Sequence, residues 1–179
     1  MTQAIAILYA TRNGYTRHIA ERLAVSVLAR GFDAQVFDAA HIPAGFSLQR
    51  YNGAILAASV CGGVHEREVN DFVKLHITKL ENMPAAFLSV THSEAGLDSQ
   101  VADDAERVIH RFLAETGWRA QTIKAVAAAL LCTQCGFLVR FVMKGIGKEF
   151  SSSTDYTDWT ALDHFAGEFL AEEAARAAV

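Results

Sequence analysis

The chain has 179 residues, of which 51% are apolar and 20% are charged, so it is long enough for one domain with a full core. Its formal charge of −4 leaves no basic excess for a general nucleic-acid binder. No apolar run approaches the roughly 18 residues that a membrane-spanning helix needs. Cys61, Cys132 and Cys135 cannot all pair within one chain and follow no secretory signal, so we expect a reducing, cytoplasmic location.

Strand-like and helix-like segments alternate along the chain, as is typical of a parallel α/β sheet in one domain over 1–179. The patterns predict five strands, at 4–9, 33–38, 54–58, 85–90 and 122–129. They predict helices at 15–30, around 69–77, at 98–115 and from about 157–159 onward. An additional segment, 131–150, lies between the fifth strand and the last helix.

A candidate phosphate loop follows the first strand and opens the first helix. Its residues are Thr11, Arg12, Asn13, Gly14, Tyr15 and Thr16. Such a loop directs backbone N–H groups and the positive end of a helix dipole at one point. Hydroxyl and amide side chains add neutral donors, and glycine permits the tight turn. The alternative is an ordinary strand–helix connection with a threonine cap. The loop lacks both G-x-G-x-x-G and the lysine of a P-loop, which favours a mononucleotide.

This loop resembles the FMN phosphate loop of the flavodoxins, [ST]-x-[TS]-[GR]-[NDG]-x-T after an N-terminal strand. The resemblance implies a doubly wound, five-stranded parallel sheet of order 2-1-3-4-5, with 131–150 as an insertion after strand five. It implies FMN as the cofactor and a phosphate held mostly by neutral donors. Arg12 departs from that pattern by adding a positive charge.

In such a sheet the ligand lies beyond the carboxyl ends of the strands, so two further loops should flank the flavin. After strand three these residues are Ala58, Ser59, Val60, Cys61, Gly62 and Gly63, whose glycines allow close backbone approach. After strand four they are Ser89, Val90, Thr91 and His92, whose amides and hydroxyls suit the pyrimidine edge. The alternative is that the glycines form only a turn and that His92 is a solvated loop residue.

Two side chains near these loops have open roles. We expect Cys61 to be a small buried side chain, although it could touch the flavin. His65 could cap the next helix or act as a proton donor near the flavin. No residue stands out as a general base, and no metal site is expected.

A closer resemblance extends over nearly the whole chain, to the menaquinone-dependent protoporphyrinogen oxidases. It is carried by residues 8–20, 57–65, 71–90, 111–119 and 156–159. The most specific stretches are N-M-P-A-A-F-L-S-V within 71–90 and Y-T-D-W at 156–159. The resemblance implies oxidation of a porphyrinogen in heme synthesis, with electrons passed to a membrane quinone.

The insertion departs from that branch, in which it is rich in arginine and tyrosine. Basic residues are few in 131–150, whereas a porphyrinogen with four carboxylates would suit several cations. Apolar and basic residues of 137–148 fall on opposite sides of a short helix, which could lie on the inner face of the cell membrane. The alternative is that this helix covers the sheet or forms a dimer contact. Cys132 and Cys135 also allow a redox dithiol, without the flanking pattern of a thioredoxin.

Two other functions remain open from the sequence. A flavodoxin electron carrier would serve protein partners, but such carriers usually have an acidic rim and aromatic residues that stack on the flavin. An FMN-dependent quinone reductase would use NAD(P)H, for which the sequence offers no recognisable site.

Overall fold

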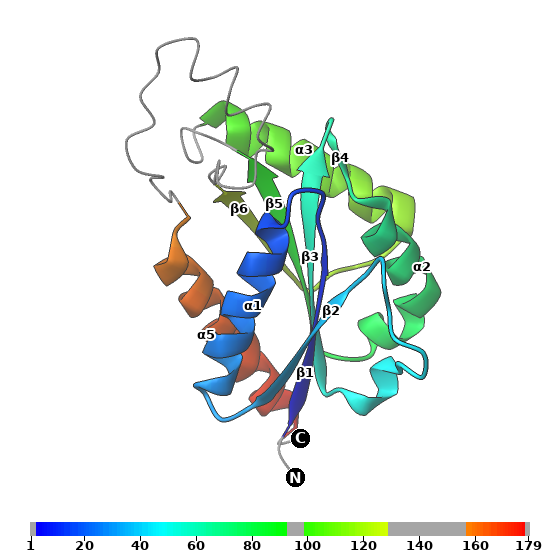
Figure 1. Cartoon of the computed structure of the whole chain (residues 1–179), viewed down its shortest axis with the longest axis vertical. Helices are drawn as coiled ribbons and strands as arrows, with labels where there is room; N and C mark the ends of the chain where they lie inside the picture. Colours follow the sequence, from blue (N-terminus) through cyan, green and yellow to red (C-terminus); the bar gives the residue numbers. More distant parts are fainter. Residues whose placement is uncertain (1–2, 93–98, 129–156, 178–179) are drawn as a thin grey trace, which may run out of the picture.

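A parallel sheet forms the centre of the computed structural model, which describes residues 3–92, 99–128 and 157–177 (Figure 1). Over these residues the strands of the sheet are β1 (Ala4–Ala10), β2 (Asp33–Asp38), β3 (Gly53–Cys61), β5 (Ala85–His92) and β6 (Thr122–Ala128). They run parallel in the order β2-β1-β3-β5-β6. A short strand, β4 (Val64–His65), pairs antiparallel with the end of β3.

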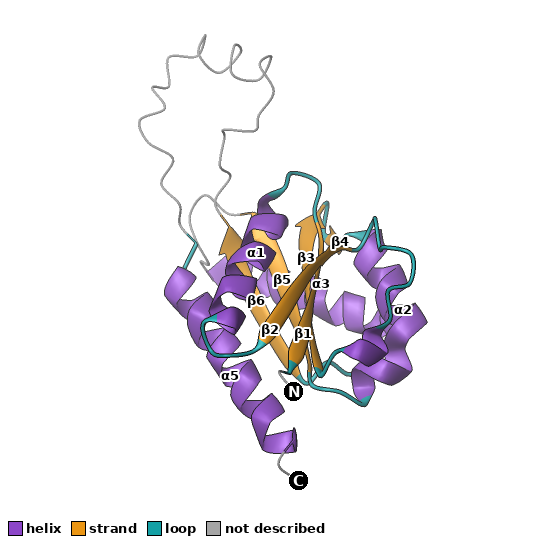
Figure 2. Cartoon of the chain, turned by 60° about the horizontal axis from the view of Figure 1, so that its bottom comes forward, coloured by secondary structure: helices purple, strands orange, loops and turns teal. Residues whose placement is uncertain are grey.

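Helices cover both faces of this sheet (Figures 1 and 2). Helices α1 (Tyr15–Leu28) and α5 (Trp159–Ala177) pack on one face, where they share a buried cluster with the sheet. Helices α2 (Arg67–Glu81) and α3 (Ser99–Thr116) pack on the other, together with the short 3-10 helix η1 (Leu48–Arg50). Helices α1, α2 and α3 each lie between two parallel strands, so the chain returns to the same end of the sheet before the next strand.

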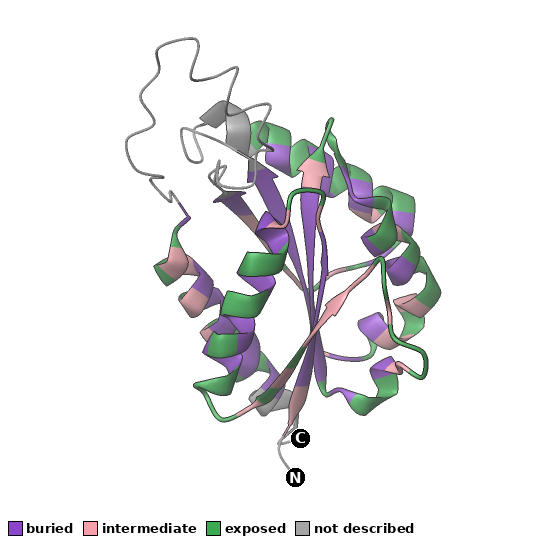
Figure 3. Ribbon diagram, viewed as in Figure 1, coloured by how far each residue is buried: buried purple, intermediate pink, exposed green. Residues whose placement is uncertain are grey.

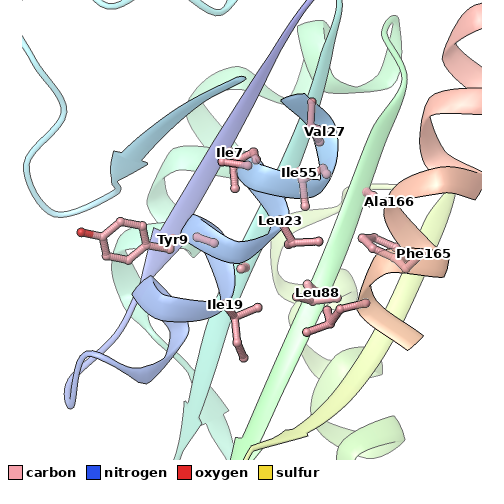
Figure 4. Close-up of a cluster of buried hydrophobic side chains, with 14 of the residues drawn as sticks. Ile7, Tyr9, Ile19, Leu23, Val27, Ile55, Leu88, Phe165 and Ala166 are labelled. Atoms are coloured by element: carbon pink, nitrogen blue, oxygen red, sulfur yellow. The ribbon is translucent and has the colours of Figure 1, made fainter. Parts of the chain in front are cut away.

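Strand β1 shows why the sequence forms this arrangement. Ile5, Ile7 and Tyr9 face the α1 and α5 side, whereas Ala6, Leu8 and Ala10 face α2 and α3. Because side chains alternate along a strand, a strand covered on both faces is a continuous apolar run. Figure 3 shows the central strands buried and the outer faces of the helices exposed. Figure 4 shows the first cluster, in which α1 and α5 side chains meet those of β1, β3 and β5.

The predicted fold is confirmed by this topology. The expected strand order 2-1-3-4-5 corresponds to β2-β1-β3-β5-β6. Each expected strand, and each expected helix within the described residues, lies within a few residues of an observed one. The sequence patterns missed β4 and the last three residues of β3, which form a hairpin around Gly62 and Gly63.

Replacing Leu23 by alanine tests the packing between α1 and the sheet. Leu23 is fully buried, so Leu23→Ala should lower the free energy of unfolding by about 2–5 kcal/mol, through lost burial and a residual cavity. Leu75→Ala is the matched control, because the Leu75 side chain on α2 is 79% exposed and its loss should change stability by at most about 0.5 kcal/mol. Urea unfolding followed by circular dichroism measures both. Equal effects of the two substitutions would contradict the assigned core.

Candidate functional site

The loops predicted to bind a ligand meet at one end of the sheet. Ala10 of β1 pairs with Ala58 of β3, which in turn pairs with Ser89 of β5. Because these strands are parallel, the segments that follow them leave the sheet side by side. Figure 1 shows the β1–α1 loop and the β3–β4 hairpin at the same end. We call this the carboxyl end of the sheet.

The β1–α1 loop has the backbone geometry of a turn onto a helix. Gly14 precedes α1 with φ of 82°, in the left-handed region that favours glycine. Its N–H donates to Thr11 Oγ1 at 3.1 Å, and the N–H of Tyr15 donates to Asn13 Oδ1 at 3.3 Å. No acidic residue occupies the first turn of α1, so the positive end of its dipole is not neutralised there. The side-chain oxygens of Thr11 and Asn13 thus sit where an anion's oxygens could replace them.

Thr16 supplies the observation that most directly indicates a ligand. Its side chain is fully buried, and its hydroxyl has no hydrogen-bond partner among the described residues. Buried hydroxyls in native proteins are nearly always paired, so an orphan in the first turn of a helix calls for an external partner. A phosphate oxygen is a suitable one, because it accepts from hydroxyl and N–H donors alike. The residues of this loop therefore fit a phosphate group.

Residues 157–159 contact the first turn of α1, which follows the β1–α1 loop. The Tyr15 hydroxyl is hydrogen-bonded to the hydroxyl of Thr157, and both side chains are buried. The Trp159 ring packs edge-on against His18, with ring centroids 5.6 Å apart. Asp158 caps α5 by accepting from the N–H of Ala161 at 2.9 Å. Tyr15 is thus directed into the protein, so its side chain is not directed at a ligand.

Arg12 forms an ion pair across the site. Its side chain is 71% exposed, but its Nε lies 3.1 Å from Oε1 and 3.2 Å from Oε2 of Glu66, whose side chain is only 7% exposed. The hydrogen bond to Glu66 and the charge of that carboxylate raise the pKa of Arg12. The positive charge predicted for this loop is therefore partnered within the protein. Glu66 was missed by the sequence analysis, because nothing in its local pattern marks it as buried.

The β3–β4 hairpin turns at Gly62 and Gly63, whose φ angles of 60° and 76° suit a two-residue hairpin turn. Ala58 and Ser59 are buried, Val60 is half-buried, and Cys61 is an exposed free thiol. The prediction that Cys61 is buried was wrong. Cys61 is exposed because β3 extends into the hairpin with β4, and Cys61 lies at the tip of that hairpin.

The side-chain hydroxyls at the end of β5, which were expected to face a ligand, are buried and bonded within the protein. Ser89, Val90 and Thr91 are all buried. The Ser89 hydroxyl shares a 2.9 Å hydrogen bond with His65 Nε2, and the Thr91 hydroxyl donates to the carbonyl of Val126 at 3.4 Å. These hydroxyls link neighbouring elements of the fold, so a ligand would meet mainly the backbone of this strand. His92 is the last residue of β5, and its side chain lies outside the described part of the chain.

His65 is a buried neutral histidine. Its ring packs edge-on against Phe87 and Phe112, with centroids 5.0 and 5.2 Å apart. Burial lowers the pKa of His65 to about 4, although the charge of Glu115 opposes this shift. His65 is therefore uncharged at neutral pH and is not a protonated donor there. The predicted capping role was wrong, because Glu66 is the residue that precedes α2, and no side chain caps that helix.

Comparison with known proteins shows the family of the chain. The family model described as "Flavodoxin domain" matches residues 6–157. Protoporphyrinogen IX dehydrogenase [quinone] of Escherichia coli K12 is 32% identical over 168 residues, covering 90% of this chain and 92% of that protein. The protein of the same name from Leishmania major is 32% identical over 173 residues, covering 92% and 74%.

The chain belongs to the flavodoxin family. Solved structures agree on the fold: an archaeal flavodoxin matches with a TM-score of 0.57 at 11% identity, over 96% of this chain and 99% of its own. Flavodoxin 1 of Bacillus cereus matches with a TM-score of 0.56 at 17% identity, over 94% and 97%. Membership of this family implies flavin binding.

Several predictions fall outside the described residues, namely those on 131–150, on the dithiol of Cys132 and Cys135, and on the membrane-facing helix of 137–148. Within the described ranges, no helix is long and apolar enough to cross a membrane. The same ranges hold no cluster of acidic, histidine and cysteine side chains that could bind a metal ion.

The buried state of His65 predicts a specific loss of stability in acid. The unfolded chain protonates this histidine below a pKa of about 6.5, whereas the folded chain does so only below about 4. Stability contributed by the neutral ring is therefore complete above pH 6.5 and falls as the pH drops towards 4, by up to roughly 3 kcal/mol.

The test compares stability against pH for wild type, His65→Gln and His164→Gln. His65→Gln should flatten the acid limb of the curve, whatever its stability at neutral pH. His164 is 74% exposed, so its variant should follow the wild-type curve. Denaturant midpoints measured from pH 7.5 to 4 give the three curves. Parallel curves for His65→Gln and wild type would show that the ring is not held neutral.

Proposed function

We propose that this chain is an FMN-dependent dehydrogenase that oxidises protoporphyrinogen IX and passes the electrons to a quinone. The observation that carries the proposal is the 32% identity to protoporphyrinogen IX dehydrogenases over 90% of the chain. The matching family model spans residues 6–157, a range that includes the loops at the carboxyl end of the sheet. When bound, FMN supplies the chemistry of accepting electrons from an organic substrate and releasing them to an acceptor.

The chain's own part is to bind and orient the cofactor. The N–H groups of Gly14 and Tyr15, with the hydroxyls of Thr11 and Thr16, would hold the phosphate. On binding, the two N–H groups would give up their hydrogen bonds to the side-chain oxygens of Thr11 and Asn13 and donate to phosphate oxygens instead. Neither N–H group is then left unpaired. The backbone of the β3–β4 hairpin and of the β5 end would flank the ring.

The hairpin also favours an enzyme over an electron carrier. Cys61, Gly62, Gly63 and Val64 carry no aromatic ring, so this hairpin offers nothing to stack over the flavin. A flavin face left open by the hairpin suits a large, flat second substrate. Segment 137–148 remains a candidate contact with the membrane that holds the quinone, with a cover for the sheet or a dimer contact as the alternative.

Activity tests the proposal directly. The chain, loaded with FMN, should convert protoporphyrinogen to fluorescent porphyrin under anaerobic conditions, and a menaquinone analogue should accelerate this. The controls are quinone without protein and protein without quinone. Porphyrin formation no faster than in the quinone-only control would refute the assignment and favour an electron carrier or another substrate.

Two substitutions test the phosphate loop. Thr16→Ala removes one hydroxyl donor to a charged group, so FMN should bind roughly tenfold or more weakly, with riboflavin affinity unchanged. Gly14→Val forces a branched residue into the left-handed region and should also weaken FMN binding. Gly45→Val is the matched control, because Gly45 has the same φ of 82° in the loop before η1 and β3. A Cβ added at Gly45 would meet no atom beyond its chain neighbours within 4 Å. Fluorescence titration gives the affinities; unchanged FMN affinity in both loop variants would contradict the assigned loop.

A further inference from the structure

Glu66 joins three segments of the carboxyl end of the sheet. Its backbone N–H donates to the carbonyl of Ser59 at 3.2 Å, and its Oε1 accepts from the Ser59 hydroxyl at 3.2 Å. The same carboxylate contacts Arg12 Nε at 3.1 Å. Ser59 lies near the end of β3, Arg12 lies in the β1–α1 loop, and Glu66 itself follows the β3–β4 hairpin. One carboxylate thus ties the phosphate loop to the hairpin.

Because the Glu66 carboxylate is buried, the loss of its partner Arg12 is more costly than the loss of a partner in an exposed ion pair. An exposed pair such as Arg67–Asp71, with side chains 88% and 62% exposed, contributes little because water screens it. Glu66 is 7% exposed, so the loss of Arg12 would leave a buried carboxylate whose remaining side-chain partner, among the described residues, is the Ser59 hydroxyl. The Arg12 side chain is itself 71% exposed, so the cost of losing it falls on the buried Glu66 carboxylate. The pair therefore links the loop to the hairpin.

We propose that Arg12 and Glu66 are positioning residues that clamp the β3–β4 hairpin to the phosphate loop and so set the spacing between the phosphate and ring ends of the flavin site. This inference rests on the proposed FMN site. Arg12 acts through Glu66, and the phosphate is held by the neutral donors of the loop. Loosening the clamp should weaken every ligand that uses the ring end of the site, with or without a phosphate.

The experiment measures the dissociation constants of FMN and riboflavin for wild type, Arg12→Gln, Glu66→Gln and the double variant. Arg12→Gln should weaken both flavins by a similar factor, roughly tenfold, because it strands the buried carboxylate. Glu66→Gln should weaken both by a smaller factor. The double variant should bind both flavins more tightly than Arg12→Gln does, and Arg12→Lys should recover most of the wild-type affinity. Visible circular dichroism of the bound flavin should change in Arg12→Gln and return in Arg12→Lys.

Arg67→Gln is the matched control, since it removes the same charge from an exposed pair one residue beyond Glu66, and it should leave both affinities unchanged. If Arg12→Gln weakens FMN but not riboflavin, Arg12 is a phosphate ligand and the clamp is refuted. Wild-type affinities for both flavins in Arg12→Gln would refute it as well. A wild-type chain that binds neither flavin contradicts the proposed function itself, and the clamp with it.

Discussion

The direction of the buried strands is the constraint on which this site depends. Strand β1 has hydrogen-bonded neighbours on both sides and helices on both faces, so its position in the sheet is fixed. Because β3, β5 and β6 run parallel to it, every segment that leaves their carboxyl ends emerges at the same place. The start of α1 is held there with its N–H groups facing outward. The apolar core thus determines where the neutral donors of the candidate site lie.

The polar groups at that end fall into two sets with different roles. The hydroxyls of Ser59, Ser89 and Thr91 bond to protein partners and hold neighbouring elements together. Only Thr16 carries a buried hydroxyl without a partner in the part of the chain that the structure describes. The stretch 157–159 belongs to the first set, because Thr157 and Trp159 contact the first turn of α1. Residues 157–159 therefore lie against the helix start that follows the β1–α1 loop.

Periodicity predicted the sheet well, because fully buried strands and amphipathic helices leave clear local patterns. The hairpin was missed because a two-residue strand is too short for any pattern, and Gly62-Gly63 suits either a loop or a turn. The error on Cys61 follows from that omission. The pair of Arg12 and Glu66 could not be predicted, since residues 54 apart meet only through the sheet register. The roles expected for His65 were wrong for the same reason, because Phe87 and Phe112, which enclose its ring, belong to other elements of the fold.

Amide chemical shifts of the chain titrated with FMN and with riboflavin show whether the start of α1 binds the phosphate. A phosphate seated at the start of α1 should shift the N–H resonances of residues 14–16 strongly with FMN and little with riboflavin, since only FMN carries the phosphate. Both ligands should shift the hairpin and the end of β5. If FMN binds while the resonances of 14–16 stay unmoved, the phosphate lies elsewhere and the account of this site is wrong.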